Sequence, residues 1–463
     1  MIKGSKEVEI LGISSHSKSV APGFLFIAKK GGNYDGAEFI SDAILAGAVA
    51  IVTDFYNPFY ENVVQLIHPN VNQIESLIAK NFYKDPSLEL FLVGITGTNG
   101  KTTTSYIVKH LLDGLGQTGL MGTIEVYTGS HRIESSLTTP EVTTTNKFLK
   151  EMVQNRCKHA VMEVSSIAVD QGRINNLDFD VGIFTNLTPE HLDYHHNLES
   201  YAKAKKDFLT RVKDWVILNQ DSDYYPFMRE GLNAKILTYS LEDETVDLYG
   251  ENIHLSSEGT TFSFRYRGKS YNIEIPLIGK HNVYNTLAAI GAAIVRGVAI
   301  KTIIERLKRV PGVPGRLEKV GCNIFVDYAH KPDALENVLK TLKEFCSQKL
   351  IVVFGCGGDR DPFKRPVMAN ITEKYADFSI VTSDNPRSED PNKILEEIVK
   401  GFHESKFAVE VDRRRAIEKA ISMASSGDIV LIAGKGHETN QVIGHCIFDF
   451  DDRLVAKEIC LSN

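Results

Sequence analysis

A short apolar segment that runs directly into a glycine-rich turn constrains the fold of this chain most strongly. Residues 88–93 have the composition of a β-strand, the turn at 94–103 reads GITGTNGKTT, and apolar residues recur at helical spacing from Ile107 to Leu115. In this order, backbone N–H groups and a helix N-terminus can cradle phosphate oxygens. We expect a nucleotide triphosphate to bind here; the alternative is a turn that merely joins strand to helix.

One lysine of this turn and the two hydroxyl groups that follow it are the side chains expected to contact phosphate and magnesium. Lys101 is placed to reach the outer phosphates, and the hydroxyl of Thr102 or Thr103 is placed to bind magnesium. Ile95 stands where the common phosphate-loop pattern has its first glycine, so this loop is a variant. The loop residues predicted to contact ATP are Gly97, Thr98, Asn99, Gly100, Lys101, Thr102 and Thr103.

Two linker-like segments divide the 463 residues into three α/β parts. The first part contains a helix-like segment at 37–45 and a strand-like run at 48–52, and the linker KDPS at 84–87 leads toward the phosphate loop. The second linker, VPGVPG at 310–315, precedes another α/β unit. The predicted domains span residues 1–88, 89–315 and 316–463.

Polar residues follow several predicted strands. Residues 159–162 lead into Glu163, and residues 181–184 lead into TNLTPEH, which ends at His191. Because the carboxyl ends of parallel strands meet at one edge of a sheet, we expect these side chains in one ligand crevice. Alternating apolar and polar residues at 262–275 predict a β-hairpin. The strands predicted in the third part are 324–327, 350–354, 378–381 and 429–433.

Charge, hydropathy and cysteine usage exclude several classes of protein. A net charge of −7 and a pI near 6.1 argue against a protein whose main work is neutralising a nucleic-acid backbone. No apolar stretch approaches the ~20 residues needed to cross a bilayer. We therefore expect a cytoplasmic monomer that binds neither membrane nor nucleic acid. The six scattered cysteines, without a CxxC pair, favour buried reduced thiols.

Glu163 and His191 are candidate ligands for a metal ion beside the phosphate loop. Hard oxygen ligands suit magnesium, and a metal that bridges phosphates offsets charge that develops on a transferred phosphoryl group. Taken alone, each residue has a simpler interpretation, as a surface acid and as a core histidine. Their placement after strands that neighbour the loop favours the metal site.

The loop sequence TGTNGKT at 96–102 resembles that of the Mur ligases, and the likeness extends along most of the chain. The resemblance implies a three-domain α/β architecture: a small N-terminal domain, a central P-loop domain with a parallel sheet, and a Rossmann-like C-terminal domain. It also implies an ATP-dependent, amide-bond-forming ligase of peptidoglycan precursor synthesis. Other segments that carry the likeness are LTTPE (137–141), GKHNVYN (279–285), GRLE (315–318), DYAHKPD (327–333), GCGGDR (355–360), DNPR (384–387) and GKGHE (434–438).

The resemblance assigns a role to one lysine that the charge pattern does not single out. Mur ligases carry an Ala-Lys pair whose lysine is carbamylated by carbon dioxide, and Lys205 in YAKAKKDFL (201–209) matches it. Carbamylation converts the cation into an anion able to help hold a second magnesium ion. Ile167 replaces the histidine of the SSHA sequence common in relatives. The implied catalytic residues are Lys101, Glu163, His191 and Lys205, and the implied metal ligands are Thr102, Glu163, His191 and carbamylated Lys205.

The resemblance also implies a site for a UDP-muramoyl dipeptide. Hydroxyl, amide and guanidinium groups suit its peptide carbonyls and carboxylates. SHSK at 15–18 and GNYDG at 32–36 fall where relatives bind the uridine nucleotide, although His16 and Lys18 replace the usual Asp and Arg. The residues assigned to this substrate are Ser15, Ser17, Thr138, Thr139, Ser165, Gln171 and Arg173.

By the same resemblance, residues beyond the loop complete the ATP site. Asn282 is assigned to adenine, and Arg316, Asp327 and His330 approach from the third domain. Such a site forms by domain closure, which also excludes water from a hydrolysable intermediate. The alternative is that Asp327 and His330 merely cap a strand and a helix.

The segment SDNPR at 383–387 indicates which amino acid is added. Arg387 offers a planar fork to a carboxylate, and DNPR marks family members that add meso-diaminopimelate, whose distal centre carries a carboxylate and an ammonium. The implied reaction joins it to UDP-N-acetylmuramoyl-L-alanyl-D-glutamate through an acyl phosphate, with ATP as cosubstrate and Mg²⁺ as cofactor. The residues assigned to the amino acid are Arg360, Asp384, Asn385, Pro386, Arg387, Gly434 and Glu438.

Other functions stay open at this point. Without the resemblance, the arginines of the third part are equally interpretable as surface ion pairs. A lysine-adding homologue and a folylpolyglutamate synthase share the loop, and a nucleotide-gated binding protein would hydrolyse ATP without making a bond.

Overall fold

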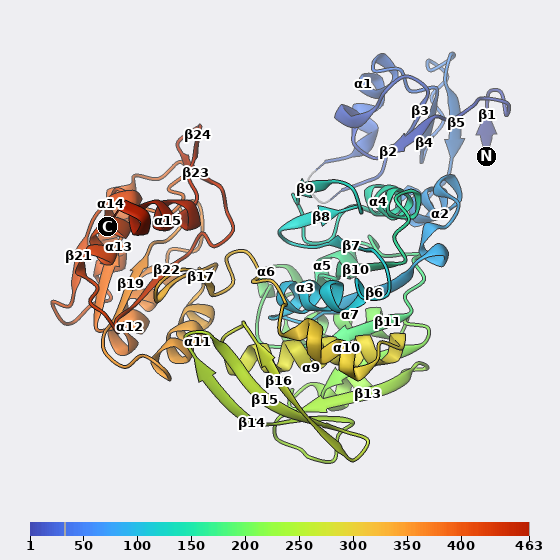
Figure 1. The fold of residues 1–463 in the computed structure, drawn as a ribbon. Coiled ribbons are helices and arrows are strands. Elements are labelled where there is room, and N and C mark those ends of the chain that lie inside the picture. Colours follow the sequence, from blue (N-terminus) through green and yellow to red (C-terminus); the bar gives the residue numbers. More distant parts are fainter. Residues whose placement is uncertain (32–33, 463) are drawn as a thin grey trace. The chain divides into compact units, whose positions relative to one another are not determined.

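The chain separates into two compact units. The computed structural model describes residues 1–31 and 34–462, and Figure 1 shows its ribbon. The domain boundaries predicted after residues 88 and 315 stay predictions. The first unit contains Met1–Tyr249 and Thr286–Ile303, and the second contains Gly250–Asn285 and Ile304–Asn463.

The N-terminal part of the first unit is a five-stranded sheet in the order β1-β5-β4-β3-β2. All of its strands pair in parallel except β1, which pairs antiparallel with β5. Successive apolar side chains point to opposite faces of the sheet, where one set packs against α1 and the other against α2. The predicted helix at 37–45 is α-helical only from Ile40, because η2 (Gly36–Phe39) is a 3₁₀ turn. The elements are β1 (Ile2–Lys3), β2 (Gly12–Ser14), η1 (Ser17–Ser19), β3 (Phe24–Ile27), α1 (Ile40–Leu45), β4 (Ala50–Thr53), β5 (Val64–Ile67) and α2 (Val71–Tyr83).

The chain enters the central part of the first unit through a defined turn rather than a loose linker. Lys84 and Asp85 adopt positive φ angles of 59° and 48°, and η3 (Pro86–Glu89) follows as a 3₁₀ turn. The Ser87 hydroxyl donates to Asp85 Oδ1 at 2.8 Å, which stabilises this turn. The prediction that the strand begins at residue 88 is therefore wrong, and β6 spans Phe91–Thr96.

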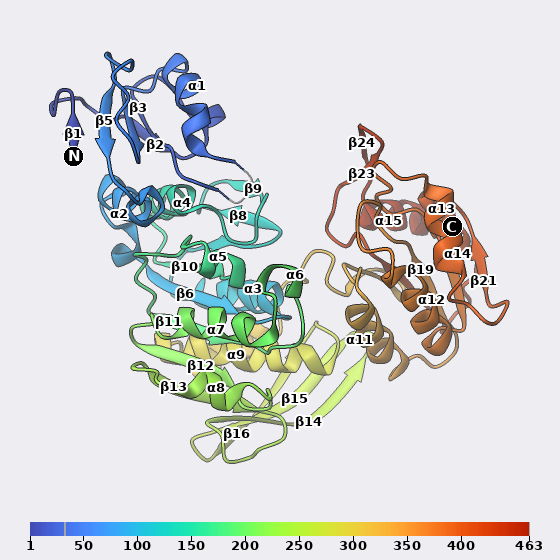
Figure 2. The ribbon, with the colours of Figure 1, turned by 180° about the vertical axis from the view of Figure 1, so that it is seen from behind.

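A parallel sheet forms the centre of the first unit, with β6 between β10 and β11. The central strands β6, β10 and β11 are almost fully buried, as expected where helices cover both faces, whereas β8 and β9 add to one edge in antiparallel pairing and β9 is exposed. Helices α5 and α7 lie on one face (Figure 2), and α3 lies on the other (Figure 1). The strands are β7 (Thr118–Met121), β8 (Glu125–Tyr127), β9 (Arg132–Glu134), β10 (His159–Glu163), β11 (Val181–Phe184), β12 (Trp215–Asn219), β13 (Lys235–Ser240) and the start of β14 (Leu248–Ser256). The helices are α3 (Lys101–Leu112), α4 (Val142–Gln154), α5 (Ser166–Asp170), α6 (Leu192–His195), α7 (Leu198–Leu209), α8 (Tyr225–Arg229), the second part of α9 (Lys280–Arg296) and the first residues of α10 (Ile300–Leu307).

Two phenylalanines fix how closely α7 approaches β6. The rings of Phe179 and Phe208 meet edge to face with centroids 5.0 Å apart. A Cβ atom on Gly94 would lie 2.5 Å from the Phe208 ring and 2.8 Å from the Phe179 ring. Glycine is therefore required in the middle of the strand that carries the phosphate loop.

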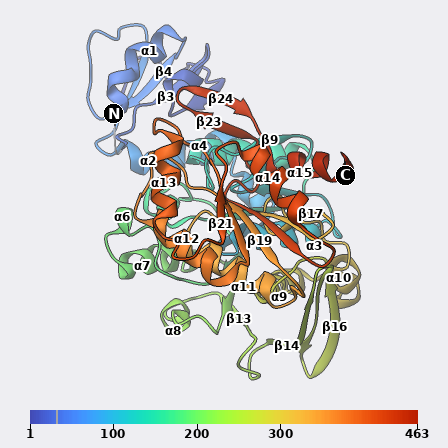
Figure 3. The same ribbon diagram turned by 90° about the vertical axis from the view of Figure 1, so that its left-hand side faces the viewer.

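The second unit contains a β-hairpin and a six-stranded sheet in the order β17-β18-β22-β19-β20-β21. The hairpin predicted at 262–275 is confirmed, and its last pair before the turn joins Tyr266 to Lys269. Figure 3 shows α12 and α13 on one side of the six-stranded sheet and α14 and α15 on the other. The four strands predicted in this part are confirmed as β18 (Ile324–Asp327), β19 (Leu350–Phe354), β20 (Phe378–Val381) and β22 (Ile429–Ala433). The remaining elements are β15 (Gly259–Tyr266), β16 (Lys269–Ile275), β17 (Glu318–Gly321), α11 (Pro332–Lys343), α12 (Lys364–Tyr375), α13 (Pro391–Val399), β21 (Phe407–Val409), α14 (Arg413–Met423), β23 (Asn440–Ile443), β24 (Cys446–Asp449) and α15 (Asp452–Ser462).

Two sequence expectations about the chain as a whole can be compared with this fold. In the described part of the chain, no helix combines the length and apolar character that a membrane span requires. All six cysteines are free, and the expectation that they are buried holds for Cys157 and Cys356; Cys346 and Cys460 are half-buried, and for the exposed Cys322 and Cys446 it is wrong. Cys322 lies in the turn between β17 and β18, and Cys446 lies in the exposed strand β24.

The packing of Phe208 against β6 predicts a large cost for removing its ring. We expect Phe208→Ala to lower the free energy of unfolding by about 3–5 kcal/mol, because the ring is fully buried and its neighbours cannot close the cavity. Phe59→Ala is the matched control, because Phe59 is 88% exposed. Urea unfolding followed by circular dichroism measures both, and equal midpoints for the two variants would contradict this packing.

Candidate functional site

The phosphate loop leaves the central strand of the parallel sheet and is braced by the neighbouring strand β11. The Thr98 N–H donates to Asn186 O at 2.9 Å, and the Asn99 N–H donates to Asn186 Oδ1 at 3.0 Å. Gly97 and Gly100 have φ angles of 147° and 84°, which glycine adopts without strain. The loop is therefore held from the carboxyl end of β11, where the sequence placed its ligand crevice.

Lys101 begins α3 and folds back over the loop. Its Nζ donates to Gly97 O at 2.8 Å and to Thr98 O at 2.7 Å. The ammonium group thus lies at the mouth of the loop, above the backbone that would cradle phosphate. This position agrees with the predicted role of Lys101 in holding phosphate oxygens.

Glu163 ends β10 as a fully buried carboxylate beside the loop. Thr102 Oγ1 donates to Glu163 Oε2 at 3.0 Å, so the two predicted magnesium ligands lie together. Thr123 adds two further contacts, from its hydroxyl to Oε2 at 3.0 Å and from its N–H to Oε1 at 2.8 Å. The sequence analysis missed Thr123, which follows the short strand β7 and belongs to no motif.

Lys205 is buried in α7 with its amine against the same loop. Its Nζ donates to Gly97 O at 2.9 Å and lies 4.3 Å from the centre of the Tyr201 ring. Burial lowers the pKa of Lys205 well below its ordinary range, and the charge of Lys101 lowers it further. Because both lysines donate to Gly97 O, the arrangement favours a neutral amine at Lys205, which is the form that reacts with carbon dioxide.

His191 lies on the Tyr201 side of the loop. Its ring centre is 6.2 Å from that of Tyr201, and the Tyr201 hydroxyl contacts Thr98 Oγ1 at 3.1 Å. His191 has a positive φ of 55° at the start of the short helix α6. Among the described residues, no three histidine, cysteine, aspartate or glutamate side chains gather as a metal site. The metal site predicted at this loop stays a prediction.

The residues predicted to bind the muramoyl dipeptide surround Glu163. Thr139 Oγ1 donates to Glu163 O at 2.8 Å and accepts from the Ser165 N–H at 3.0 Å. Arg173 donates from Nη1 to Thr139 O at 3.0 Å and from Nη2 to Gln171 Oε1 at 2.6 Å. The hydroxyl of Thr138, also predicted, contacts that of Thr123 at 3.1 Å. The fold thus brings Thr138, Thr139, Ser165, Gln171 and Arg173 to one end of the phosphate loop.

A cleft of about 960 Å³ lies between the N-terminal sheet and α4. Ser15 and His16 line one wall, and Leu137 lines the other, whereas Ser17 and Lys18 do not line it. A nucleotide fits a cavity of this size. Gly32 and Asn33, which belong to the other predicted uridine segment, lie outside the described residues.

Lys29 links the two walls of this cleft, and the sequence analysis missed it. Its Nζ lies 3.0 Å from Glu75 Oε2 and 2.7 Å from Glu141 Oε2, and Glu141 Oε1 lies 3.2 Å from Arg173 Nε. Burial raises the pKa of Glu141, but Lys29 and Arg173 outweigh it and leave the pKa below its ordinary value. Glu141 therefore stays ionised beside the predicted dipeptide site.

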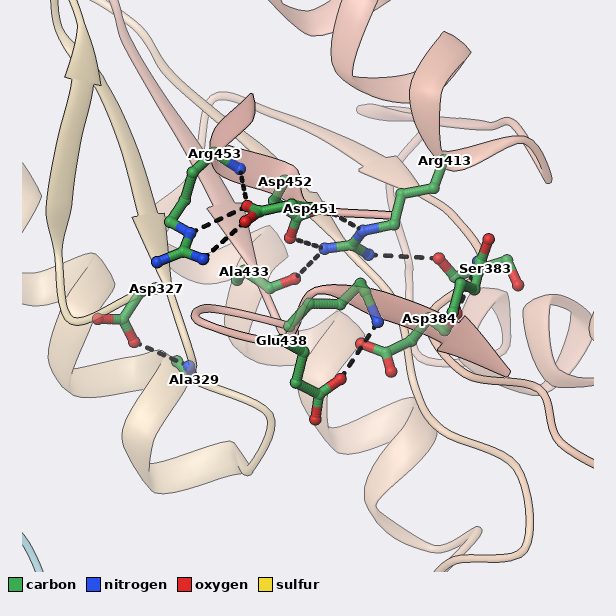
Figure 4. A network of polar contacts seen from close by, with 12 residues as sticks. Asp327, Ala329, Ser383, Asp384, Arg413, Ala433, Glu438, Asp451, Asp452 and Arg453 are labelled. Carbon is green, nitrogen blue, oxygen red and sulfur yellow. Dashed lines mark hydrogen bonds and ion pairs between the residues drawn. The ribbon is translucent and has the colours of Figure 1, made fainter. Parts of the chain in front are cut away.

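In the second unit, Asp327 ends β18 and is buried. It accepts from the Leu317 N–H at 2.6 Å and from the Ala329 N–H at 2.8 Å, and Figure 4 shows the second of these bonds. Burial raises the pKa of Asp327, and the charge of Arg316 opposes this effect. These contacts are those of a backbone cap, and a role of Asp327 toward ATP stays a prediction.

An aromatic cluster surrounds Tyr328 beside Asp327. The ring centres of His330 and His437 lie 4.6 Å and 4.8 Å from that of Tyr328, and the Arg316 guanidinium lies 4.8 Å from it. Burial lowers the pKa of His330 and of His437 to about 4, so both imidazoles are neutral at pH 7. Asn282, the predicted adenine contact, donates from Nδ2 to Ile278 O at 2.8 Å.

The segments predicted to bind the amino acid lie together at the carboxyl edge of the six-stranded sheet. Asn385 Nδ2 donates to Glu438 Oε2 at 2.8 Å, and a Cβ atom on Gly434 would lie 2.6 Å from Asp384 Oδ2. Arg387, after Pro386, has a positive φ of 52° and donates from Nη1 to Gly358 O at 2.7 Å. Arg360 is exposed and contacts the carbonyl of Asp359 at 3.3 Å.

A fully buried ion pair supports these loops from behind, and the sequence analysis missed it. Arg413 Nε and Nη2 contact the two carboxylate oxygens of Asp452 at 2.7 Å each, with both side chains 0% exposed. Arg413 also donates to Ser383 O at 3.3 Å and to Ala433 O at 3.0 Å (Figure 4). It therefore ties together the ends of β20 and β22, from which both loops begin.

A glycine loop at the head of a parallel sheet, with a buried carboxylate and a buried lysine beside it, defines a P-loop nucleotide-binding protein. Comparison with known families narrows this class. Residues 9–83 match the Mur ligase family, catalytic domain; residues 95–293 match the Mur ligase middle domain; and residues 315–436 match the Mur ligase, glutamate ligase domain. The chain belongs to the Mur ligase family.

Full-length relatives agree with this membership. The chain is 45% identical to the UDP-N-acetylmuramoyl-L-alanyl-D-glutamate–2,6-diaminopimelate ligase of Chlamydia caviae over 98% of this chain and 96% of the relative. It is 44% identical to the ligase of that name from Bacillus cereus over 97% and 94%. A solved structure of a ligase of that name has a TM-score of 0.72 and 33% identity and covers 98% of this chain and 95% of its own. A MurF ligase from Thermotoga maritima, solved with ADP, shares the fold at 18% identity, with a TM-score of 0.65 and coverage of 99% and 98%.

The lowered pKa of Lys205 predicts a pH-dependent difference in stability. Between that pKa and the ordinary value of 10.5, the unfolded chain binds one proton more at this residue, so stability rises with pH by up to ~1.4 kcal/mol per unit. Lys205→Met lacks this dependence. We expect it to be more stable than the parent chain at pH 7, with a difference that shrinks as the pH rises toward 10.5.

Urea unfolding between pH 7 and pH 9 in buffers depleted of carbon dioxide measures this difference. Lys203→Met is the control, because Lys203 lies on the same helix and is exposed. If the stabilities of Lys205→Met and the parent chain ran parallel over this range, the assignment of a lowered pKa to Lys205 would be wrong.

Proposed function

We propose that this chain is the ATP-dependent ligase that joins meso-diaminopimelate to UDP-N-acetylmuramoyl-L-alanyl-D-glutamate in peptidoglycan precursor synthesis. The observation that carries the proposal is the convergence of Lys101, Thr102, Glu163 and Lys205 on one phosphate loop. Full-length relatives named for this reaction, at 41–45% identity, support the choice of substrates. The predicted monomeric state and cytoplasmic location stay predictions.

The reaction proceeds in two steps. The side-chain carboxylate of the substrate's glutamate attacks the γ-phosphorus of ATP, which forms an acyl phosphate and releases ADP. The amine of diaminopimelate then attacks the acyl carbon, the tetrahedral intermediate collapses, and inorganic phosphate leaves as the amide bond forms. The amine loses its proton in the second step, so the products are ADP, phosphate and the amide.

Lys101 acts electrostatically in the first step. Its ammonium now rests on Gly97 O and Thr98 O and can turn to the phosphate oxygens that occupy the loop. Fixed positive charge at this place offsets the charge that develops on the transferred phosphoryl group. Arg173 and the hydroxyls of Thr138 and Thr139 orient the dipeptide carboxylate near Glu163.

Magnesium fits the oxygen-rich environment of the loop. The hydroxyl of Thr102 and the buried carboxylate of Glu163 are hard ligands, and both are buried beside the loop. After carbamylation, Lys205 would supply a further oxygen ligand, and His191, whose ring lies near that of Tyr201, would be a further candidate ligand. When bound, magnesium neutralises phosphate charge. The residues of this chain hold the oxygens in place and keep Lys205 in the neutral form that accepts carbon dioxide.

The distal end of diaminopimelate binds at the edge of the six-stranded sheet in the second unit. Arg387 supplies a guanidinium fork for its carboxylate, and Glu438 supplies a carboxylate for its ammonium. Asn385, two residues before Arg387 in the sequence, donates directly to Glu438. A free lysine side chain carries only the ammonium and leaves Arg387 without a partner.

The balance of products distinguishes the ligase from a protein that only hydrolyses ATP. We expect ADP and amide in equal amounts, and no ADP release unless the UDP-muramoyl dipeptide is present. Lys101→Met should lower kcat by about 100-fold or more, since the loop loses its charge toward phosphate. Coupled ADP detection and mass spectrometry of the product measure both quantities. Phosphate release that ignores the dipeptide nucleotide would favour the non-synthetic alternative.

Replacement of Arg387 tests the choice of amino acid. We expect Arg387→Ala to weaken the use of diaminopimelate by about 2 kcal/mol or more, read from kcat/KM, because the substrate carboxylate loses its charged partner. Arg387→Lys keeps the charge without the fork and should recover only part of the loss. Kinetics with diaminopimelate and with lysine decide between the two ligases: a parent chain that prefers lysine would identify the lysine-adding homologue.

A further inference from the structure

Lys435 is a buried lysine beside the predicted amino-acid site of the second unit. The proposed reaction gives this lysine no role. It follows Gly434, and its side chain is 0% exposed. Its Nζ donates to Asn385 Oδ1 at 3.1 Å, to Glu438 Oε2 at 3.2 Å and to Asn440 O at 2.6 Å. An ammonium has three N–H donors, so this group is fully satisfied.

These contacts join the segment 435–440 to Asn385, which lies 50 residues earlier in the sequence. Asn385 belongs to the loop after β20, Glu438 to the loop after β22, and Asn440 begins β23. The same strand bonds the first loop again, because the Val442 N–H donates to Asn385 Oδ1 at 3.0 Å and Gln441 Nε2 donates to the carbonyl of Asp384 at 2.7 Å. Lys435 is thus the charged centre of a network that fixes both loops.

The network leaves one donor and one acceptor side by side. Asn385 accepts two hydrogen bonds at Oδ1 and donates one from Nδ2 to Glu438 Oε2. Among the described residues, its second N–H and Glu438 Oε1 have no hydrogen-bond partner or ion pair. An adjacent donor and acceptor match a carboxylate and an ammonium on the same carbon atom.

Lys435 also sets the charge of this place. Its ammonium cancels the charge of Glu438, and Arg413 is cancelled by Asp452 behind the loops. Without Lys435, the carboxylate of Glu438 would attract any ammonium, including the lone ammonium of a lysine side chain. With Lys435 present, an ammonium gains most when it arrives together with a carboxylate that accepts a hydrogen bond from the N–H of Asn385. Specificity for diaminopimelate then arises because Glu438 attracts the lone ammonium of free lysine less strongly.

We propose that Lys435 is a positioning and specificity-determining residue, which holds Asn385 and Glu438 so that a zwitterionic α-amino-acid end is preferred to a lone ammonium. The proposal rests on the proposed function. It assigns a role to a residue that makes no contact with the substrate itself.

The test is the ratio of specificity constants for diaminopimelate and lysine. Both amino acids are offered together, with lysine in excess, and mass spectrometry of the product gives the ratio. In Lys435→Met the preference for diaminopimelate should fall by about tenfold or more, because the half-buried Glu438 loses the buried cation that pairs with it. The KM for ATP should stay within about twofold. A merely structural role would lower the use of both amino acids alike and leave the ratio unchanged, and that result would overturn the proposal.

Two further variants make the test decisive. Lys435→Gln keeps N–H donors but removes the charge, so it should show a fall in the ratio even where Lys435→Met does not fold. Lys343→Met is the matched control, because Lys343 forms a half-exposed ion pair with Asp377 in the same unit, 2.9 Å apart, and its ratio should equal that of the parent chain. An unchanged ratio in Lys435→Gln would contradict the role of the charge.

The parent chain separates the two proposals. If it formed no product with either amino acid, the proposed function would fail and the specificity comparison would not apply. If it preferred diaminopimelate while Lys435→Met and Lys435→Gln kept the same ratio, only the role of Lys435 would fail.

A double-mutant cycle adds an independent readout. If Lys435 acts through Asn385, the losses in kcat/KM for diaminopimelate caused by Lys435→Met and Asn385→Ala should not multiply in the double variant. Losses that multiply fully would show that the two residues act separately, which contradicts the proposal.

Discussion

The parallel pairing of three strands determines where the chemistry of the first unit lies. In the register of β10, β6 and β11, Glu163 is opposite Ile95 and Phe184 is opposite Thr96. The strands therefore end at one level, and the carboxylate of Glu163 and the residues after β11 meet the glycine loop. The close approach of α7 to these strands depends on Gly94, since a Cβ atom there would clash with the rings of Phe208 and Phe179. The distance of Lys205 from the loop is thus set by the packing beneath it.

The shared carbonyl of Gly97 is the electrostatic consequence of that packing. Two lysine amines donate to one oxygen, and only Lys101 lies at the N-terminus of a helix. A helix N-terminus disfavours a cation. A bound phosphate would therefore draw the ammonium of Lys101 away from the loop carbonyls. The pKa of Lys205 is instead lowered by burial and by the charge of Lys101. Two lysines with different tasks therefore share the carbonyl of Gly97. Lys101 supplies the charge for phosphate, and Lys205 supplies the amine that can react.

The sequence predicted strands best and long-range contacts worst. The strands at 181–184, 324–327, 350–354, 378–381 and 429–433 were confirmed at both ends, because apolar runs buried on both faces stop where polar residues begin. The start of β6 was missed because Pro86 and the turn before it extend a 3₁₀ segment into an apolar run. Lys205 could not be told from Lys203 and Lys206 by composition, since only the packing of α7 buries one of them. Lys29 was missed for the same reason: its partner Glu141 lies 112 residues away.

The two buried lysines show how surroundings assign different tasks to one side chain. Lys205 has a neutral carbonyl as acceptor and a second cation nearby, so burial favours loss of its proton. Lys435 has a carboxylate, an amide oxygen and a carbonyl as acceptors, so its charge is paired and its three donors are used. The first environment produces an amine that can react, and the second produces a fixed cation that orders its neighbours. Fully satisfied polar networks of the second kind leave only a few groups for a ligand, so the arrangement of the leftover donor and acceptor determines what binds.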